Sequence, residues 1–435
     1  MKFLNKNFPI FCLIISVSIF FYTFYKSIII FSGEKNDFYL AYYIASFLLI
    51  FFSIILFFLK EKIREYLIIL FFSFLVSIYL FEVVLTFKPH LVNFDKKYKK
   101  KNLIEFDKRD KKKIYEDLKK INENIVLTVS PDIFLNSKKK AYNIFPFSNI
   151  SNAKTIHCNE NGYYSIYKSD RYGFNNPDYE WDQITTEYLL VGDSFTHGAC
   201  VNRPNDISSQ LRILSKKSVI NLGSSGNGPL IEYATLREYL NKNVKKVLWL
   251  YYKNDLNDLK KELSNKILLN YLNDPEFTQN LKFKQSQIDA LKKGLILVEK
   301  KNKNNFFKIL NVLKLNFTRS LIYSYLPEKY KYEQPMAPEF KEILRLAKEL
   351  TELNNIKFYF VYLPSFNFYK YKHNTGYNAV KDVVNELQIP FIDLHMEFFS
   401  KQKNPLIYFP FGLKGHYNVE GYKKVSEIIF NKTKN

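Results

Sequence analysis

The chain has 435 residues, of which 47% are hydrophobic and 17% aromatic, and its formal net charge is +22 at pH 7. This hydrophobic content excludes an intrinsically disordered protein, and the length suffices for two or three structural units. A strongly basic chain suggests nucleic acid or an anionic membrane surface as a partner. Because lysines are spread along the whole soluble part and no nucleic-acid-binding motif accompanies them, we expect no nucleic-acid partner.

Three long apolar runs precede Phe87, and ordinary globular patterning begins only after about Asn124. Each run is about as long as a helix must be to cross the hydrocarbon core of a bilayer. The first run is too long for a cleaved signal peptide, and the other two follow it too closely. Residues 1–90 are therefore predicted to form a membrane anchor with three transmembrane helices, at about 8–31, 38–59 and 66–87.

The charges of the connecting loops predict the orientation of these helices. Positive charge lies at Lys2 and Lys6 before the first run and at residues 60–64 between the second and the third. Because cytoplasmic loops carry the excess of lysine and arginine, we expect the C-terminal part to be extracytoplasmic, on the periplasmic or cell-surface side. Basic clusters within residues 91–124, a segment expected to form a charged juxtamembrane stalk, oppose this orientation, although long domains can translocate regardless of such charge.

From residue 125 onward the pattern is that of a folded domain. An irregular lead-in packed near the active site is expected at 125–181. After it, short apolar runs alternate with helical apolar spacing, which predicts an α/β domain with a parallel sheet covered on both faces. The predicted strands are 188–191, 218–222, 244–252, 356–363 and 389–393, and the predicted helices include 229–241, 338–353 and 377–387. The long insertion at about 255–335 has mostly helical periodicity and is interpreted as a helical cap or subdomain.

The first predicted strand of this sheet ends in a distinctive motif. Leu189 to Val201 reads LLVGDSFTHGACV, with Ser194 on a tight turn after the strand. A serine at this point lies where open α/β sheets bind ligands. The motif is not the G-x-S-x-G elbow, because Thr196 takes the place of the second glycine. It resembles the first block of the SGNH (GDSL-type) hydrolase superfamily, in which the serine of GDS is the nucleophile.

Three later segments resemble the other blocks of that superfamily. The resemblance covers roughly 187–430 and implies a three-layer, flavodoxin-like α/β/α fold with a five-stranded parallel sheet. In NLGSSGNGP (221–229) it implies that the backbone N–H of Gly226, or alternatively of Gly223, donates to the oxyanion. In YYKNDLNDL (251–259) it gives the same role to the Asn254 side chain, although Lys253 departs from the family pattern. In YFPFGLKGHYNVEGYKKV (408–425) it makes His416 the general base.

The acid of the superfamily is missing from its usual position. The family has an aspartate three residues before the histidine, and Leu413 stands there in this chain. Two alternatives follow: a Ser–His dyad whose imidazole is oriented by a backbone carbonyl, or another acid such as Asp393 or Asp255.

The cysteines and the remaining histidines suggest no metal or cofactor. Cys158 and Cys200 are the only cysteines of the C-terminal part, and in an exported domain they would form a disulfide; two unpaired small residues are the alternative. His157, His197, His373 and His395 have no metal-like spacing with each other or with the cysteines.

The resemblance implies an esterase that hydrolyses an O-acyl ester through a serine ester intermediate, with a cell-envelope glycan as a candidate substrate. One alternative is an O-acyltransferase that modifies an exported polysaccharide and needs a membrane partner to supply the acyl group. Another is a non-catalytic, membrane-anchored glycan-binding or assembly protein, which the missing acid favours. The expected partners are thus an acyl-ester substrate, the lipid bilayer and, for the transferase, that membrane partner.

Overall fold

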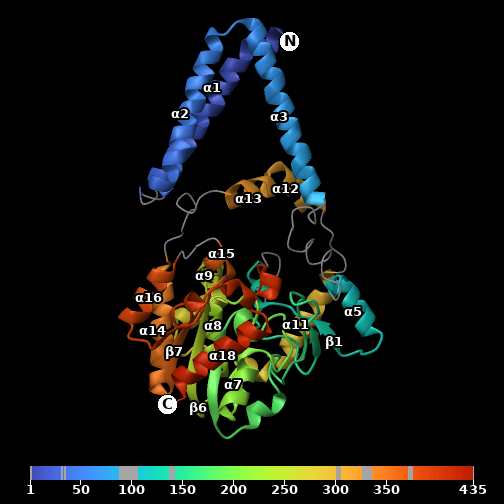
Figure 1. Ribbon diagram of the computed structural model, residues 1–435, viewed down its shortest axis with the longest axis vertical. Helices are drawn as coiled ribbons and strands as arrows, with labels where there is room; N and C mark the ends of the chain where they lie inside the picture. The colour runs from blue at the N-terminus through green and yellow to red at the C-terminus, as the bar shows by residue number, and fades with distance from the viewer. Residues whose placement is uncertain are drawn as a thin grey trace. The chain divides into compact units, whose positions relative to one another are not determined.

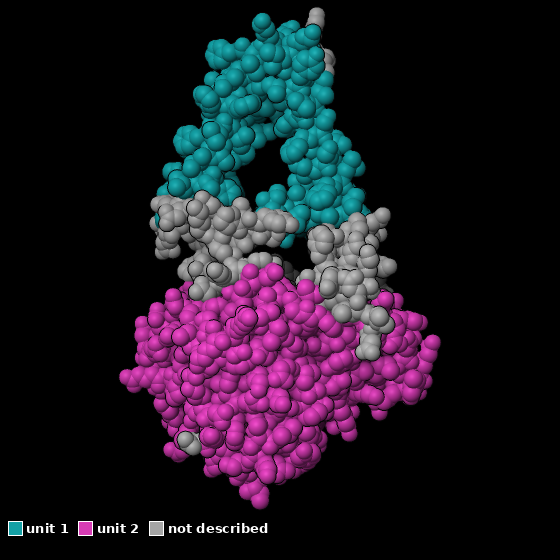
Figure 2. Space-filling model, viewed as in Figure 1, with its two compact units in different colours: residues 1–94, 303–334 teal, residues 95–302, 335–435 magenta. Residues whose placement is uncertain are grey.

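The computed structural model describes residues 2–30, 33, 36–87, 106–136, 143–299, 305–325, 336–370 and 376–434. The chain forms two compact units (Figure 2). One comprises residues 1–94 and 303–334, and the other residues 95–302 and 335–435. Each unit is described by itself below.

The first unit contains three helices long and apolar enough to cross a membrane, as predicted: Phe3–Ile30, Tyr39–Phe58 and Glu61–Phe87. They correspond to α1 (Lys2–Phe24) with the π-helix η1 (Tyr25–Ile30), to α2 (Asn36–Phe58) and to α3 (Glu61–Phe87). Two short helices from the predicted insertion, α12 (Asn305–Leu313) and α13 (Asn316–Tyr325), pack against α3 in this unit.

The second unit is built on a five-stranded, all-parallel sheet, which confirms the predicted fold class (Figure 1). The strands are β4 (Thr186–Gly192), β5 (Val219–Asn221), β6 (Val244–Tyr252), β7 (Lys357–Leu363) and β8 (Phe391–Asp393). Their order is β5-β4-β6-β7-β8. In chain order β5 and β6 follow β4, and they lie on opposite sides of it, so the strand order reverses at β4. Ligands bind outside the carboxyl end of such a strand.

Alternate residues of these strands pack into two hydrophobic cores. Leu189 and Val191 of β4 belong to one core with residues of α8 (Pro229–Tyr239), α14 (Pro338–Leu353) and α16 (Tyr377–Glu386). Tyr188 and Leu190 belong to the other with residues of α7 (Ile207–Ser215) and α18 (Val419–Thr433). Since successive side chains of a strand point to opposite faces, the domain has three layers. The remaining short elements after the insertion are α15 (Phe366–Lys370), α17 (Leu394–Glu397), η7 (Phe399–Lys401), η8 (Pro405–Tyr408) and η9 (Pro410–Gly412).

The lead-in contains more regular structure than the sequence indicates. After α5 (Lys111–Lys119), strands β1 (Ile125–Leu127), β2 (Lys154–Ile156) and β3 (Ile166–Lys168) form a small sheet. β1 pairs parallel and β3 antiparallel with β2. Two 3-10 helices, η3 (Pro131–Asn136) and η4 (Asp178–Asp182), complete this part. Three-residue strands are too short to show an alternating pattern, so the sequence does not predict them.

The predicted insertion is divided between the two units. Helices α9 (Asp255–Glu262), α10 (Lys266–Asn273) and α11 (Gln285–Glu299), with η5 (Leu281–Phe283), lie in the α/β unit. There α11 packs on the lead-in, where the Asp289 carboxylate accepts hydrogen bonds from the Ser151 N–H at 2.9 Å and hydroxyl at 2.7 Å. Residues 91–105 of the predicted stalk lie outside the described residues, and the rest of it, at 106–124, contains α5.

Candidate active site

The turn that carries Ser194 requires its glycine. Gly192 ends β4 with φ of 152°, and a Cβ there would lie 2.1 Å from Thr196 Oγ1 and 2.6 Å from the Leu250 carbonyl oxygen. The next residue, Asp193, accepts a hydrogen bond from the Phe195 N–H at 2.8 Å and so caps the short helix α6 (Ser194–His197). Ser194 therefore begins a helix at the carboxyl end of β4, where the strand order reverses.

His416 lies directly against this serine, as the sequence resemblance implies. Its Nε2 is 2.8 Å from Ser194 Oγ. The imidazole precedes α18, whose N-cap Asn418 accepts from the Gly421 N–H at 2.9 Å. The ring of Phe195 packs on the imidazole with centroids 4.7 Å apart. Helix capping and aromatic packing thus hold a base within hydrogen-bond reach of a hydroxyl 222 residues earlier in the chain.

A carboxylate that the sequence did not identify completes the group. Glu160, in the loop between β2 and β3, places its Oε2 3.1 Å from His416 Nδ1, and the same oxygen accepts the His416 backbone N–H at 2.6 Å. The two acids considered from the sequence bond elsewhere. Asp393 accepts from the Tyr377 hydroxyl and the Met396 N–H, and Asp255 accepts from the Tyr252 N–H at 2.9 Å.

A disulfide between Cys158 and Cys200, the expected pair, joins the loop that carries Glu160 to the turn that carries Ser194. Cys158 precedes Glu160 by two residues, and Cys200 follows Ser194 by six. The Asn161 side chain adds a hydrogen bond to the Cys200 carbonyl oxygen at 3.0 Å. The short spacing from Cys158 to Glu160 was the one signal in the sequence that could have located the acid.

The oxyanion donors inferred from the resemblance lie around the same edge of the sheet. The Gly223 N–H already donates to the Asn221 side chain at 2.8 Å, which favours Gly226 over Gly223. Gly226 has φ of 79°, and a Cβ there would lie 2.7 Å from the Asp132 carboxylate. The Asn254 amide donates to Asp258 Oδ2 at 3.0 Å, and the Asn254 side chain also opposes part of the rise that burial causes in the pKa of Asp193.

The electrostatics of the site raise the basicity of the His416 imidazole. Burial lowers the pKa of His416, but the charge and hydrogen bond of Glu160 together with the charge of Asp193 outweigh it, so the pKa lies above its ordinary value. Burial raises the pKa of Asp193 to about 6, against the opposing effects of the Phe195 N–H, His416 and Asn254. A base with a raised pKa is a strong proton acceptor once it is neutral.

The other histidines have different surroundings. His157 Nε2 is 2.8 Å from the Ser225 hydroxyl, beside Gly226, and its ring lies 4.5 Å from that of His197. His395 Nδ1 is 3.0 Å from the Tyr369 hydroxyl. His373 lies outside the described residues.

Ligand atoms of Glu160, Cys200 and His416 lie within 4.8 Å of one another, which is close enough to hold a metal ion. The Cys200 sulfur is oxidised in the disulfide, and His416 bonds to Ser194 and Glu160. A thiolate is the form of cysteine that binds metals, so these three residues do not suit a metal site.

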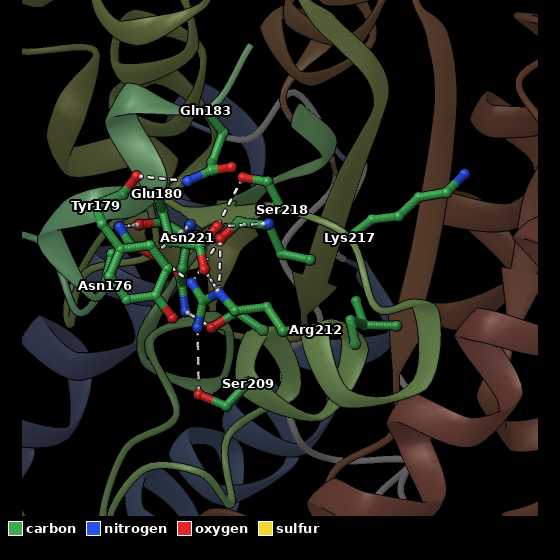
Figure 3. Close-up of polar contacts among 12 residues, drawn as sticks. Asn176, Tyr179, Glu180, Gln183, Ser209, Arg212, Lys217, Ser218 and Asn221 are labelled. Carbon is green, nitrogen blue, oxygen red and sulfur yellow. Dashed lines mark hydrogen bonds and ion pairs between the residues drawn. The ribbon is translucent and has the colours of Figure 1, made fainter. Parts of the chain in front are cut away.

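A second polar region lies at the opposite, amino edge of the sheet, around the start of β5. It is a hollow of about 670 Å³, and Arg212 and Glu180 form an ion pair of 3.0 Å beside it (Figure 3). Glu180 also accepts from the Ser218 hydroxyl at 2.6 Å. Because these groups satisfy one another, Glu180 fixes η4 both to α7, through Arg212, and to the start of β5, through Ser218, far along the strands from Ser194.

Comparisons with known proteins give structural similarity alone. No family model matches the chain, and no curated protein matches it. Similar solved structures include a putative lipolytic protein of the G-D-S-L family from Desulfitobacterium hafniense DCB-2, with 14% identity over 57% of this chain and 99% of that one and a TM-score of 0.32.

Two further similar structures carry esterase titles. The acetyl xylan esterase AlAXEase has 13% identity over 56% of this chain and 98% of that one, with a TM-score of 0.33. A mutant of Axe2, an acetyl-xylooligosaccharide esterase from Geobacillus Stearmophilus, has 15% identity over 57% and 95%, with a TM-score of 0.31. The roles given to Ser194, His416 and Glu160 rest on the distances above.

Proposed function

We propose that this chain is a membrane-anchored serine esterase of the SGNH type, which hydrolyses O-acyl esters. The observation that carries the proposal is the continuous contact from Ser194 Oγ through His416 to Glu160, with distances of 2.8 and 3.1 Å. A hydroxyl, an imidazole and a carboxylate in this order form the group that serine hydrolases use on several unrelated folds. Glu160 also removes the observation that favoured a non-catalytic glycan-binding protein, the missing acid at Leu413.

In the proposed first step, His416 Nε2 takes the Ser194 proton while Oγ forms a bond to the acyl carbon. The carbonyl electrons move to its oxygen, which the N–H groups of Ser194 and Gly226 and the Asn254 amide stabilise. When the carbonyl re-forms, the alcohol leaves with the proton that His416 held. Water then attacks the acyl-serine in the same way, which releases the acid and restores the hydroxyl. Glu160 orients the imidazole and stabilises its charged form.

We further propose that the α/β domain is extracytoplasmic and that its substrate is an acylated cell-envelope glycan. The charges of the loops between the spans support the orientation, and a disulfide beside the active site suits an oxidising compartment. Polymers of the envelope are within reach of an enzyme anchored by three helices.

A direct test compares the full-length protein with its Ser194→Ala variant on a short acyl ester such as p-nitrophenyl acetate. We expect turnover to fall by roughly 10³-fold or more, and an unchanged rate would exclude the mechanism. Ser264→Ala, a substitution at an exposed turn between α9 and α10, serves as the matched control. In cells, Ser194→Ala should leave envelope glycans with more O-acyl groups than the parent strain has.

The membrane anchor also supports a second candidate, an O-acyltransferase in which a glycan hydroxyl replaces water in the second step. The three spans would place the α/β domain beside a membrane partner that supplies the acyl group. Incubation of the protein with an acyl donor and a glycan would identify the transferase if it produced more acylated glycan than free acid. In cells the Ser194→Ala strain would then have fewer O-acyl groups on the glycan, the opposite of the result expected for the esterase.

A further inference from the structure

A buried acidic residue lies near the C-terminal end of the third span, and its partners lie far away in the sequence. Glu82 of α3 is fully buried. Its carboxylate accepts three hydrogen bonds, from the Phe317 N–H at 2.8 Å and from the N–H and hydroxyl of Thr318, both at 2.7 Å. A charged residue inside a membrane span needs such partners, because no water is present to solvate it.

The donors are the first turn of α13. The first N–H groups of a helix have no acceptor within that helix, and its amino end carries partial positive charge. A carboxylate there satisfies both groups and places an anion at the favourable end of the dipole. Glu82 therefore fixes the beginning of α13 to α3, and the Tyr79 hydroxyl, one turn earlier, adds a contact of 3.5 Å to the carbonyl oxygen of Leu313 at the end of α12.

The position of Glu82 along α3 determines the depth of this contact. It lies five residues before Phe87, the last residue of the helix. At a rise of about 1.5 Å per residue, this is about 8 Å from the helix end. Amphipathic helices in the membrane interface bury their apolar faces about 5–10 Å into the boundary between headgroups and acyl chains. With Phe87 at the end of the hydrophobic span, a helical pair attached at Glu82 would lie at the depth of that boundary.

The surface of α12 and α13 combines exposed apolar and basic side chains, as a helix in the headgroup region requires. Among the side chains described at 309–322, the large apolar ones exposed in the absence of lipid are Ile309 (54%), Leu313 (61%) and Ile322 (59%). Lys314 and Arg319 are exposed beside them. Ile309 and Leu313 are four residues apart and therefore share one face of α12. Exposed isoleucine and leucine would be unfavourable in water, and the basic residues suit anionic headgroups.

We propose that residues 305–325 form an interfacial helical pair, seated in the lipid headgroup region and fixed to the third span by Glu82. The occupant of its exposed apolar face is the lipid of the bilayer, since the pair packs against α3, whose apolar side chains such as Leu80 and Val84 are themselves exposed. The insertion leaves the α/β domain and returns to it, so the proposal gives this domain a second covalent connection to the membrane besides the segment after α3. It does not depend on the proposed esterase activity.

Membrane contact of the pair can be measured in vesicles. The full-length Cys12→Ala protein, with single cysteines introduced by Ile309→Cys, Leu313→Cys or Ile322→Cys, is labelled with an environment-sensitive fluorophore. It is reconstituted into phosphatidylcholine–phosphatidylglycerol vesicles that contain headgroup-nitroxide lipid. Leu353→Cys, an 82% exposed apolar position at the end of α14, is the matched control.

We expect the nitroxide to quench the three labels at least about twofold more than the control, and aqueous iodide to quench them less. Quenching equal to that of the Leu353→Cys control in both measurements would overturn the proposal.

The attachment at Glu82 is tested by hydrogen exchange of the backbone in the same vesicles. In the parent protein the N–H groups of Phe317 and Thr318 should be protected, although they begin a helix. Glu82→Gln should accelerate their exchange by roughly tenfold, because the charge-assisted acceptor is lost. Glu61→Gln, at the exposed opposite end of the same helix, should leave it unchanged. Equal exchange in the parent and Glu82→Gln proteins would overturn the attachment, while the lipid measurements test the interfacial position independently.

Discussion

At the residue scale, Glu160 places its carboxylate beside His416 in space although it is far from His416 in the sequence. The family pattern puts the acid three residues before the histidine, where Leu413 stands. Here the carboxylate comes from a loop 256 residues earlier and reaches both the ring and the backbone of His416. No spacing rule relates Glu160 to His416, so the family pattern leads to Ser194 and His416, whereas only the nearby Cys158 points to this acid.

Replacing Glu160 by glutamine should change the pH dependence as well as the rate. His416 must be neutral to accept the serine proton, and the Glu160 charge raises its pKa. In Glu160→Gln, kcat should therefore fall by roughly 10²- to 10⁴-fold. The acid limb of kcat/KM should also move to lower pH, because the imidazole loses its proton more easily.

A pH–rate profile on a soluble ester measures both effects. Glu420→Gln, which changes an acid on α18 outside this group, should leave the profile in place. An acid limb that stays at the parent pH in Glu160→Gln would show that Glu160 does not act on His416.

Gly226 offers a test of the oxyanion loop. Its φ of 79° and the approach of the Asp132 carboxylate leave no room for a side chain. Gly226→Ala should therefore displace the loop and lower kcat by roughly 10²-fold or more, with a smaller change in KM. Gly294→Ala, in α11 where a Cβ meets no atom within 4 Å, is the matched control and should stabilise the fold by about 0.5–1 kcal/mol. A Gly226→Ala enzyme with the parent kcat would remove this residue from the mechanism.

At the scale of elements, the disulfide connects the loop that carries Glu160 with the turn that carries Ser194. It closes a loop of 42 residues, which corresponds to about 4 kcal/mol of stability by chain entropy. Replacing both cysteines by alanine should lower kcat even well below the unfolding temperature, because Glu160 is two residues from Cys158.

A double-mutant cycle separates this positioning effect from stability. If the disulfide acts through Glu160, the double cysteine replacement should lower kcat much less in a Glu160→Gln background than in the parent. Equal losses in both backgrounds would mean that the crosslink contributes only stability.

Buried carboxyl groups at the carboxyl edge of the sheet should make the domain more stable in mild acid. Burial, together with the charges of Asp193 and Glu262, raises the pKa of Glu232, and burial raises that of Glu262 to about 8. A carboxyl with a raised pKa in the folded state contributes fully below its unfolded pKa of about 4.3, and this contribution is lost as the pH rises toward the folded value.

Glu232→Gln should therefore match the parent near pH 5 and be more stable than the parent near pH 8. Unfolding followed by tryptophan fluorescence reports on this domain, because both tryptophans, Trp181 and Trp249, lie in it. Glu276→Gln, at an exposed position after α10, is the control. A parent protein equally stable at the two pH values would contradict the expected charge effect.

The elements that could be predicted are those whose periodicity is long enough to read. β6 and α14 have the predicted boundaries, and the order of strands and helices after Ser194 is as expected. Continuous apolar runs and 3.6-residue spacing extend over many residues there, which makes these elements predictable. The small sheet of the lead-in was missed because three residues show no period. The division of the insertion was missed because helical spacing does not reveal which unit a helix packs against.

At the scale of the whole molecule, the side of the membrane on which the α/β domain lies is the question that its disulfide can answer. Outside the cytoplasm, Cys158 and Cys200 should be oxidised and accessible to reagents that do not cross the membrane. In intact cells producing the Cys12→Ala protein, an impermeant maleimide–polyethylene glycol should add nothing before reduction. After an impermeant reductant it should add two groups, at Cys158 and Cys200. Labelling before reduction would contradict the disulfide, and labelling only after lysis would place the domain in the cytoplasm.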